Sequence, residues 1–309
     1  MVGAVVRAPG RPLPWRRAGV RPASPAAALG GVRGRSRISR FGAFALGTLW
    51  LVFVLGPIYY MVLISFRSPA EYLTANAWLP TGGLTLSSYA AVFDSSGIGT
   101  YFRNSAELSV GTIAVVVLLS LMAGYRVVRR ASRFSAVSFR VILFGIAVPI
   151  QAIVIPLYFL SNKIHIYDTM YGLILVLSAS LIPVAVLLMV NYLRLIPRQL
   201  YDAMSVDGAG PWSTFVHLVV PMARPVMAVI GIYAGLGAWN NFLLPLILTQ
   251  SNSDMVLPLG MYRFASSDQY ALNVPVVMAV VVFSVLPLLV LYLGLRRQFV
   301  RGIGGFALR

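Results

Sequence analysis

Six long windows without a charged residue dominate this sequence. Each is at least about 18 residues long, the length that marks a candidate transmembrane helix. Their continuous Leu, Val, Ile and Ala runs lack the alternation of an outer-membrane barrel strand. The windows are residues 41–66, 108–125, 141–162, 169–193, 225–253 and 269–295. We therefore predict an all-α membrane protein with six transmembrane helices at about residues 42–65, 105–124, 140–161, 171–193, 225–248 and 275–295.

The composition fits a membrane protein and excludes most other classes. Hydrophobic residues make up 59% of the 309 residues and charged residues only 11%, whereas soluble domains carry about 25% charged residues. The absence of cysteine excludes disulfides, thiol nucleophiles and thiolate metal sites. A seventh uncharged window, residues 72–93, contains Pro80, two glycines and two serines in a polar run, so we predict a loop there.

The basic residues predict how the chain is oriented in the membrane. The net charge is +17, and 21 of the 25 Lys and Arg residues fall in the N-terminal segment, the second and fourth loops and the C-terminal segment. Because Arg and Lys concentrate on the cytoplasmic side, we expect both termini to be cytoplasmic. Residues 1–40, rich in Pro, Gly and Arg, should form a flexible basic tail on anionic membrane lipid, with no nucleic-acid partner.

The sequence contains no recognisable catalytic or metal-binding constellation. Lys163, the only lysine, lacks the glycine pattern of a phosphate-binding loop, so we expect no ATP site on this chain. His165 and His217 are isolated, and Glu107 is the one carboxylate within a predicted span, near its outer end. An ion-driven carrier usually has several ionisable residues deep in its helices, and an intramembrane enzyme would need a cluster of them. An autonomous channel or secondary carrier for a small polar solute is the alternative function, and these counts argue against it.

The fourth loop, at about residues 197–221, has the most informative local pattern. Pro197 can open a short helix at its first turn, and Asp202 lies one turn into it. Asp207 and Gly208 predict a turn, with Asp207 as the N-cap of a second short helix whose opening turn contains Pro211. The pattern predicts a helix–bend–helix protrusion on the cytoplasmic face. By spacing alone, this protrusion is either an inert connector or a contact surface.

The same loop resembles a family motif. Pro197, Leu200, Asp202-Ala203 and Asp207-Gly208-Ala209, followed by Phe215, Pro221 and Pro225, are similar to the EAA loop of permease subunits in bacterial ABC importers. In that family the loop docks into a groove of the cytoplasmic ATPase and passes its movement to the membrane helices. The resemblance implies a coupling role for Asp202, Ala203, Met204, Asp207, Gly208 and Ala209. The usual Glu-Ala-Ala triplet is Asp202-Ala203-Met204 here, which keeps the charge on a shorter side chain.

Further matches, in the family's order, extend the resemblance over about residues 41–305 and indicate its carbohydrate-uptake branch, similar to the maltose system's second permease. They are Ser65-Phe66-Arg67, Arg103-Asn104-Ser105, Asp168-Thr169, Trp239-Asn240-Asn241-Phe242, Leu257-Pro258-Leu259-Gly260 and Gln298-Phe299-Val300-Arg301-Gly302. The resemblance implies a permease in a bacterial cell membrane, without enzyme activity. It also implies a second permease subunit, a cytoplasmic ATPase dimer that holds the ATP, an extracytoplasmic solute-binding protein and a sugar as cargo.

Trp239, Asn240 and Asn241 form a polar group near the middle of the fifth predicted span. Adjacent amides at that depth are costly unless they are hydrogen-bonded. They either bond neighbouring helices, or form a polar patch with an aromatic platform for a sugar. Prolines also lie within or at the ends of most spans, and we expect them to face neighbouring helices or a wet cavity; they are Pro57, Pro149, Pro156, Pro183, Pro245, Pro275 and Pro287.

Overall fold

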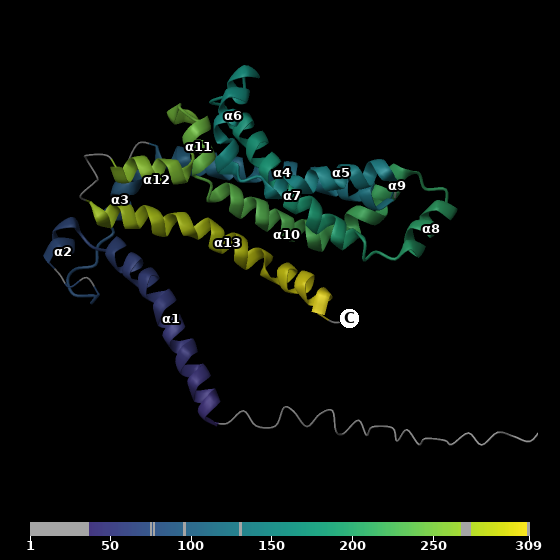
Figure 1. The fold of residues 1–309 in the computed structure, drawn as a ribbon. Coiled ribbons are helices and arrows are strands. Elements are labelled where there is room, and N and C mark those ends of the chain that lie inside the picture. The colour runs from purple at the N-terminus through teal and green to yellow at the C-terminus, as the bar shows by residue number, and fades with distance from the viewer. Residues whose placement is uncertain are drawn as a thin grey trace, which may run out of the picture. The chain divides into compact units, whose positions relative to one another are not determined.

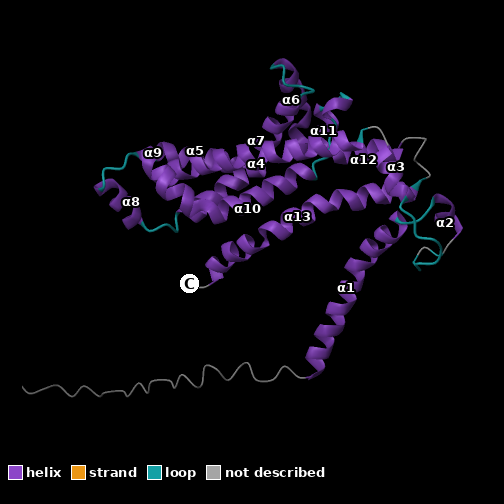
Figure 2. Cartoon of the chain, turned by 180° about the vertical axis from the view of Figure 1, so that it is seen from behind, coloured by secondary structure: helices purple, strands orange, loops and turns teal. Residues whose placement is uncertain are grey.

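The computed structural model is helical throughout the part of the chain that it describes. The described residues are 37–74, 76, 78–94, 97–129, 132–266 and 273–307, and they contain no strand. Figure 2 shows only helices and loops among them. The chain divides into two compact units, residues 1–56 and 57–309. The all-α class predicted from the apolar windows is therefore confirmed for this part of the chain.

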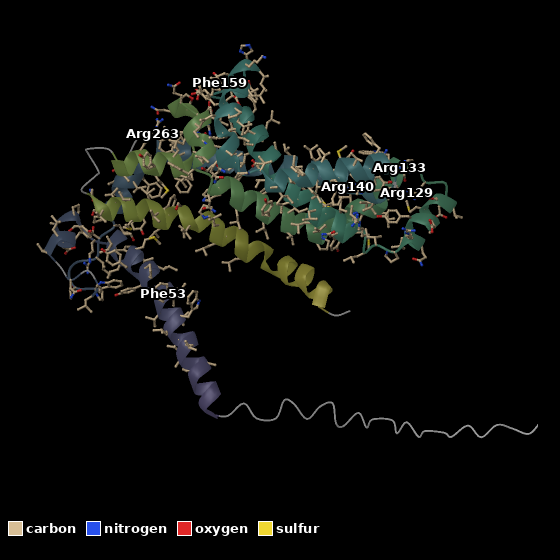
Figure 3. All side chains as sticks on the ribbon, viewed as in Figure 1. Phe53, Arg129, Arg133, Arg140, Phe159 and Arg263 are labelled. Atoms are coloured by element: carbon tan, nitrogen blue, oxygen red, sulfur yellow. The ribbon has the colours of Figure 1, made fainter. Side chains whose placement is uncertain are left out.

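The described part of the first unit is the beginning of α1 (Arg37–Ser65). Most of the predicted basic tail, residues 1–36, lies outside the described residues, whereas Arg37–Arg40 already belong to this helix. Large apolar side chains along α1 are exposed, including Phe53 (Figure 3). Its ring stacks on that of the exposed Trp50, with 6.0 Å between the ring centres. A helix that exposes apolar side chains in this way is suited to a lipid environment.

Three long helices form the core of the second unit. They are α4 (Ile98–Arg129), α7 (Met170–Leu193) and α10 (Val220–Trp239), which lie side by side in Figure 1. Val116, Met189 and Ile230 from these helices are fully buried in one hydrophobic cluster. α13 (Val274–Ala307) packs along α10, and its residues Val276, Ala279 and Val280 share a smaller cluster with Val92 and Ile98.

Shorter helices surround this core. The prediction of a loop over residues 72–93 was wrong in part, because this window contains the end of α2 (Pro69–Thr74) and all but the last residue of α3 (Ser87–Asp94). Residues 78–86, before α3, are not helical. The remaining helices are α5 (Arg133–Phe144), η2 (Gly145–Ala147), α6 (Ile150–Lys163), α8 (Arg198–Val206), α9 (Pro211–Thr214), the π-helix η3 (Phe215–Val219), α11 (Leu243–Leu248), η4 (Asn252–Asp254) and α12 (Leu257–Ser266).

The third predicted span is broken, so the expectation of one helix over residues 140–161 was wrong. α5 with η2 and α6 meet at an angle of 106°. Pro149 lies at the break as the N-cap of α6, and Val148 before it is extended, with φ −88° and ψ 108°. Proline disfavours the helical region for the residue that precedes it, and it has no N–H to continue the helix. The sequence of this window therefore stops one helix and starts another.

The fifth predicted span is also interrupted, and the expectation of one helix over residues 225–248 was wrong. α10 ends at Trp239, and α11 begins at Leu243. Asn240 Nδ2 donates to the Leu236 carbonyl (3.0 Å), and Asn241 Oδ1 accepts from the Leu244 N–H (3.1 Å). The Asn241 oxygen thus pairs an N–H in the first turn of α11, and the Asn240 amide adds a second bond to a carbonyl that already accepts from the Asn240 backbone N–H (3.1 Å).

Hydrogen bonds connect the segments that follow these breaks. The Asp168 carboxylate accepts from the Gln250 N–H (2.7 Å) and from the Ser251 N–H (2.9 Å) and hydroxyl (3.0 Å). Partial burial opposes the effect of these bonds, but together they hold the pKa of Asp168 below its usual value. Asn104 on α4 donates to the carbonyls of Ser253 (2.6 Å) and Met255 (2.9 Å). The segment before α12 is therefore fixed to two distant parts of the chain.

Four of the described helical segments are long and apolar enough to cross a membrane, and the bent α5–α6 pair makes a fifth if it counts as one span. The four are Gly42–Ser65, Ile98–Arg129, Met170–Leu193 and Pro211–Trp239. The apolar part of α13, Val274–Val290, is shorter. The fold is thus an all-helical membrane protein with four to five apolar spans.

Gly172 provides a test of this packing. A Cβ at Gly172 would clash with the backbone oxygen of Ile166, which a side-chain movement cannot relieve. We expect Gly172→Ala to destabilise the protein by about 1–3 kcal/mol, as overpacking does, and to lower the melting temperature in detergent. Gly231→Ala on α10 is the control, because its Cβ would meet only Ile113 Cγ2 at 3.7 Å. Equal melting temperatures for the two variants would contradict the close approach.

Candidate functional site: the loop between α7 and α10

The loop between α7 and α10 forms the predicted helix–bend–helix protrusion. After α7 the chain passes through the buried Ile196 into α8, and α9 then leads through η3 into α10. Figure 1 shows α8 beyond the ends of α5, α7 and α9. Pro197 is the N-cap of α8, and Pro211 is the first residue of α9, so both prolines begin helices as predicted.

One predicted detail of the bend was wrong. Asp207 does not cap α9 but is the C-cap of α8, and Gly210 is the N-cap of α9. Gly208 has a φ of +75°, a conformation that L side chains rarely adopt. The Gly208 N–H bonds the Ser205 carbonyl (3.2 Å), and the Ala209 N–H bonds the Met204 carbonyl (2.9 Å). The bend is therefore a glycine-terminated helix end, in which Gly208 turns the chain while carbonyls of the last turn stay bonded.

The six residues predicted to contact an ATPase lie together on α8 and the bend. Asp202, Ala203, Asp207 and Gly208 are exposed, and Met204 and Ala209 are half-buried. Val206, at the end of α8, is 86% exposed. An apolar side chain at this exposure stands in solvent unless another protein covers it. The protrusion thus presents both charged and apolar side chains at its surface.

The inner side of α8 is fixed to α4. Tyr201 is only 6% exposed and belongs to the same hydrophobic cluster as Met189 and Ile230. Arg129 Nη2 at the end of α4 donates to Ser205 Oγ (3.2 Å), and its guanidinium carbon lies 5.9 Å from the centre of the Tyr201 ring. These contacts provide a mechanical connection between α8 and α4. The sequence analysis missed this connection, because it used Arg129 only as evidence for the orientation of the chain in the membrane.

A second contact fixes the other end of the loop. The Tyr125 hydroxyl on α4 donates to the Pro211 carbonyl (3.0 Å), and the Tyr125 ring packs 5.4 Å from the ring of Phe215. The Trp212 ring stacks on the same Phe215 ring at 5.3 Å. Both ends of the loop thus contact α4.

The second predicted site, Trp239-Asn240-Asn241, lies at the end of α10 and not in the middle of a span. Trp239 is 8% exposed, and its indole Nε1 donates to the Ser284 carbonyl of α13 (3.2 Å). Asn240 is exposed and Asn241 half-buried, and both bond local backbone as described above. Trp239 thus bonds a neighbouring helix, and the exposed Asn240 is the residue whose amide is open to solvent or solute.

Of the other polar residues singled out in the sequence, Glu107 and His165 stand apart from these sites, whereas His217 lies on η3 within the loop. Glu107, His165 and His217 are all exposed. Within the residues that the structure describes, no group of three or more His, Asp or Glu side chains is arranged to hold a metal ion. The His217 Nδ1 lies 3.3 Å from Ser213 Oγ, one turn earlier. Glu107 and His165 therefore add nothing to the loop or to the α10 end, and the His217 ring contacts Ser213 of the same loop.

The apolar helices define a multi-pass membrane protein, and the loop between α7 and α10 is exposed and anchored to α4. The family model for the binding-protein-dependent transport system inner membrane component matches residues 116–305, more than half of the chain. The chain belongs to this family. It is an inner-membrane permease subunit of an ABC transporter, and its role is transport rather than catalysis.

Individual relatives agree with this assignment. The chain is 34% identical to the diacetylchitobiose uptake system permease protein NgcG of Streptomyces coelicolor, over 84% of this chain and 86% of that protein. It is 28% identical to the arabinooligosaccharides transport system permease protein AraQ of Halalkalibacterium halodurans, over 84% and 92%. A crystal structure of a bacterial ABC transporter involved in the import of alginate has a chain of similar fold, with a TM-score of 0.77 at 20% identity, over 86% of this chain and 99% of that one.

The conformation of Gly208 can be tested directly. Because its φ is +75° and a Cβ would meet open space, Gly208→Ala changes only the backbone preference, at a cost of roughly 1–2 kcal/mol. We expect hydrogen exchange of the α8 amides to rise about 5- to 30-fold. Gly210→Ala is the matched control, with open space around it and a φ of −67°. The same exchange rates in both variants would show that Gly208 does not hold the bend.

Proposed function

We propose that this chain is a permease subunit of an ATP-driven importer that carries a sugar or sugar derivative into the cytoplasm. Membership of the binding-protein-dependent family supports the importer class. Relatives named for the uptake of diacetylchitobiose and arabinooligosaccharides support a carbohydrate cargo. The observation that carries the mechanism is the exposed α8 protrusion fixed to α4 by Tyr201 and Arg129.

The proposed assembly contains three partners besides the cargo and the lipid. A second permease subunit completes the translocation pathway, and a cytoplasmic ATPase dimer binds the ATP. An extracytoplasmic solute-binding protein delivers the sugar. A related transporter, with a TM-score of 0.61 and 16% identity to this chain, has been solved in complex with an alginate pentasaccharide-bound periplasmic protein. This chain itself would need no cofactor for its part of the cycle.

We further propose six spans over residues 41–305, with both termini and the α8 loop in the cytoplasm. In this arrangement the bent α5–α6 pair and α13 each cross the membrane once. The charge distribution supports the orientation: Arg129, Arg133 and Arg140 lie near the α8 end of the second unit, whereas Arg263 lies toward the other end (Figure 3). The positive-inside rule assigns the end with more arginines to the cytoplasm. Residues 1–40 would then form a basic cytoplasmic segment.

Cysteine labelling tests this orientation, because the chain has no cysteine of its own. Val206 in α8 and Ser253 in η4 are both exposed. A membrane-impermeant maleimide added to spheroplasts should label Ser253→Cys and spare Val206→Cys, and permeabilisation should expose both. Labelling of Val206→Cys alone in intact spheroplasts would invert the topology and remove the basis for the coupling role of α8.

The proposed coupling mechanism follows from the loop contacts. When the ATPase subunits close on ATP, they would displace α8 through its exposed residues. Tyr201 and Arg129 would carry that displacement to the end of α4, and Tyr125 and Phe215 would carry it to α4 and the start of α10. Because interiors are closely packed, α4, α7 and α10 would then move as units rather than deform. This movement would open the translocation pathway to one side of the membrane or the other.

Asp202 tests this role. Its exposed carboxylate would meet cationic or polar groups of the ATPase, and like charges placed opposite each other at an interface cost several kcal/mol. We expect Asp202→Arg to abolish ATP-driven uptake while the chain still inserts in the membrane. Asp202→Glu keeps the charge and should keep uptake. Normal assembly and transport by Asp202→Arg would make the loop an inert connector.

Asn240 offers the sharper test of cargo contact. Asn241 bonds the Leu244 N–H, so its replacement would also remove a helix-capping bond. Asn240→Leu would cost about 1–3 kcal/mol if it leaves a sugar hydroxyl unpaired, or about 5- to 150-fold in affinity. Uptake of radiolabelled oligosaccharides by the assembled complex measures this, with Asn241→Ser, which retains a capping oxygen, as the control. Unchanged uptake by Asn240→Leu would reject the contact, and no uptake of any sugar by the wild-type complex would reject the cargo class.

A further inference from the structure

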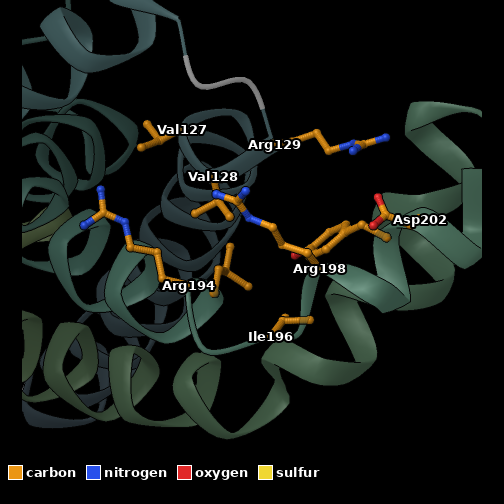
Figure 4. A pocket seen from close by; sticks show the side chains of 9 residues that line it. Val127, Val128, Arg129, Arg194, Ile196, Arg198 and Asp202 are labelled. Carbon is orange, nitrogen blue, oxygen red and sulfur yellow. The ribbon is translucent and has the colours of Figure 1, made fainter. Parts of the chain in front are cut away.

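A cavity of about 620 Å³ lies beside α8, where the ends of α4 and α7 meet the start of α8 (Figure 4). Its volume falls within the range of about 300–1,000 Å³ typical of small-molecule sites. The residues that line it are Val127, Val128, Arg129, Leu193, Arg194, Ile196, Arg198, Tyr201 and Asp202. The cavity is thus shared by α4, α7 and α8, which the proposed mechanism requires to move together.

The lining of this cavity is strongly basic. Three of its nine residues are arginines, and Asp202 is the only acidic one, which leaves a formal surplus of two positive charges. Arg129, Arg194 and Arg198 each come from a different helix or helix end, and Figure 4 shows their side chains around the hollow. Arg194 is held over the Phe139 ring, with 5.7 Å between the guanidinium carbon and the ring centre. A guanidinium has five N–H donors, so these contacts leave donors available for a further acceptor.

Tyr201 supplies an independent observation. Its side chain is 94% buried and lines this cavity, and its hydroxyl has no hydrogen-bond partner among the described residues. Burial, with a smaller contribution from Tyr125, raises the pKa of Tyr201, so the hydroxyl keeps its proton at neutral pH. A buried donor without an acceptor is costly. A ligand that carries an acceptor would relieve this cost.

We infer that this cavity binds a phosphate-bearing anion through Arg129, Arg194 and Arg198, with the Tyr201 hydroxyl as a fourth donor. A guanidinium fork matches phosphate oxygens in a bidentate manner. A phosphate monoester dianion balances the surplus of two positive charges fully, and a phosphodiester headgroup, which carries one negative charge, balances half of it. The phosphate belongs either to a small phosphorylated molecule or to the headgroup of an anionic phospholipid at the membrane surface.

A bound phosphate bridges the ends of α4 and α7 to α8. Its effect on transport rests on the proposed coupling role of α8, since a ligand that links these three elements changes how α8 displacement reaches the membrane helices. The binding itself does not depend on that role. It needs neither the ATPase nor the partner permease.

The test uses the full chain in nanodiscs of phosphatidylcholine, titrated with inorganic phosphate at constant ionic strength. We expect saturable binding by calorimetry and a higher melting temperature. Arg194→Gln/Arg198→Gln should weaken the affinity by about tenfold or more, because it removes two charge-assisted contacts. Tyr201→Phe, which removes only the hydroxyl, should weaken it about 2- to 10-fold. Arg224→Gln, at an exposed arginine outside the cavity lining, is the control and should bind as the wild type does.

A second arm distinguishes the sources of the phosphate. If the ligand is a lipid headgroup, phosphatidylglycerol in the nanodisc should compete with inorganic phosphate, and native mass spectrometry should detect it on the wild type and less of it on the double variant. If the ligand is a soluble phosphate ester, phosphatidylglycerol should leave phosphate binding unchanged.

Two results would overturn the inference: no saturable binding of phosphate or phosphatidylglycerol, or equal binding by the wild type, the double variant and Tyr201→Phe. If the double variant does not insert, Tyr201→Phe alone decides. Phosphate binding that persists while Asp202→Arg transports normally would reject the coupling role and leave this site intact.

Discussion

Backbone hydrogen bonding in hydrocarbon is the constraint on which this structure depends. A bilayer core offers no water to an unpaired N–H or C=O group, so a spanning segment must bond its own backbone as a helix. The long helices α4, α7 and α10 meet this requirement over most of their length, apart from the missing N–H groups of Pro183 in α7 and Pro225 in α10. Where helices begin, side chains can pair the free N–H groups: Asn241 Oδ1 accepts from the Leu244 N–H in the first turn of α11, and Thr169 Oγ1 accepts from the Gly172 N–H at the start of α7. These two helix starts have a side-chain oxygen as acceptor, whereas Pro149 at the start of α6 makes no such bond.

A small number of contacts connects the membrane helices to the loop between α7 and α10. α8 is short and one face of it is polar, so it has little reason to persist alone. Its position comes from Tyr201, which is buried in the core cluster, and from Arg129, which bonds Ser205. The exposed face is then free to carry Asp202, Asp207 and the apolar Val206. An anchored inner face with an exposed outer face is the arrangement that a transmitted movement needs.

Much of this was predictable from the sequence, and the failures have physical causes. Apolar runs between charges predicted helices because period and length are local properties, and Gly208 followed from the chain's need to turn after α8. The break at Pro149 was visible as a proline, but the sequence did not say whether it bends a helix or ends it. Asp207 and Gly210 can both cap a helix, and the choice between them depends on where α8 stops. Arg129 and Ser205 lie 76 residues apart, so their contact depends on the packing of α4 against the loop.

The most direct measurement of the coupling claim is site-specific crosslinking from the exposed end of α8. A Val206→Cys chain, carrying a photoactivatable probe on that cysteine, would be crosslinked in its native membrane during ATP turnover, and the products identified by mass spectrometry. The account predicts a crosslink to a nucleotide-binding subunit, with a yield that changes when ATP hydrolysis is blocked by vanadate. Crosslinks confined to lipid or to an extracytoplasmic protein would contradict it.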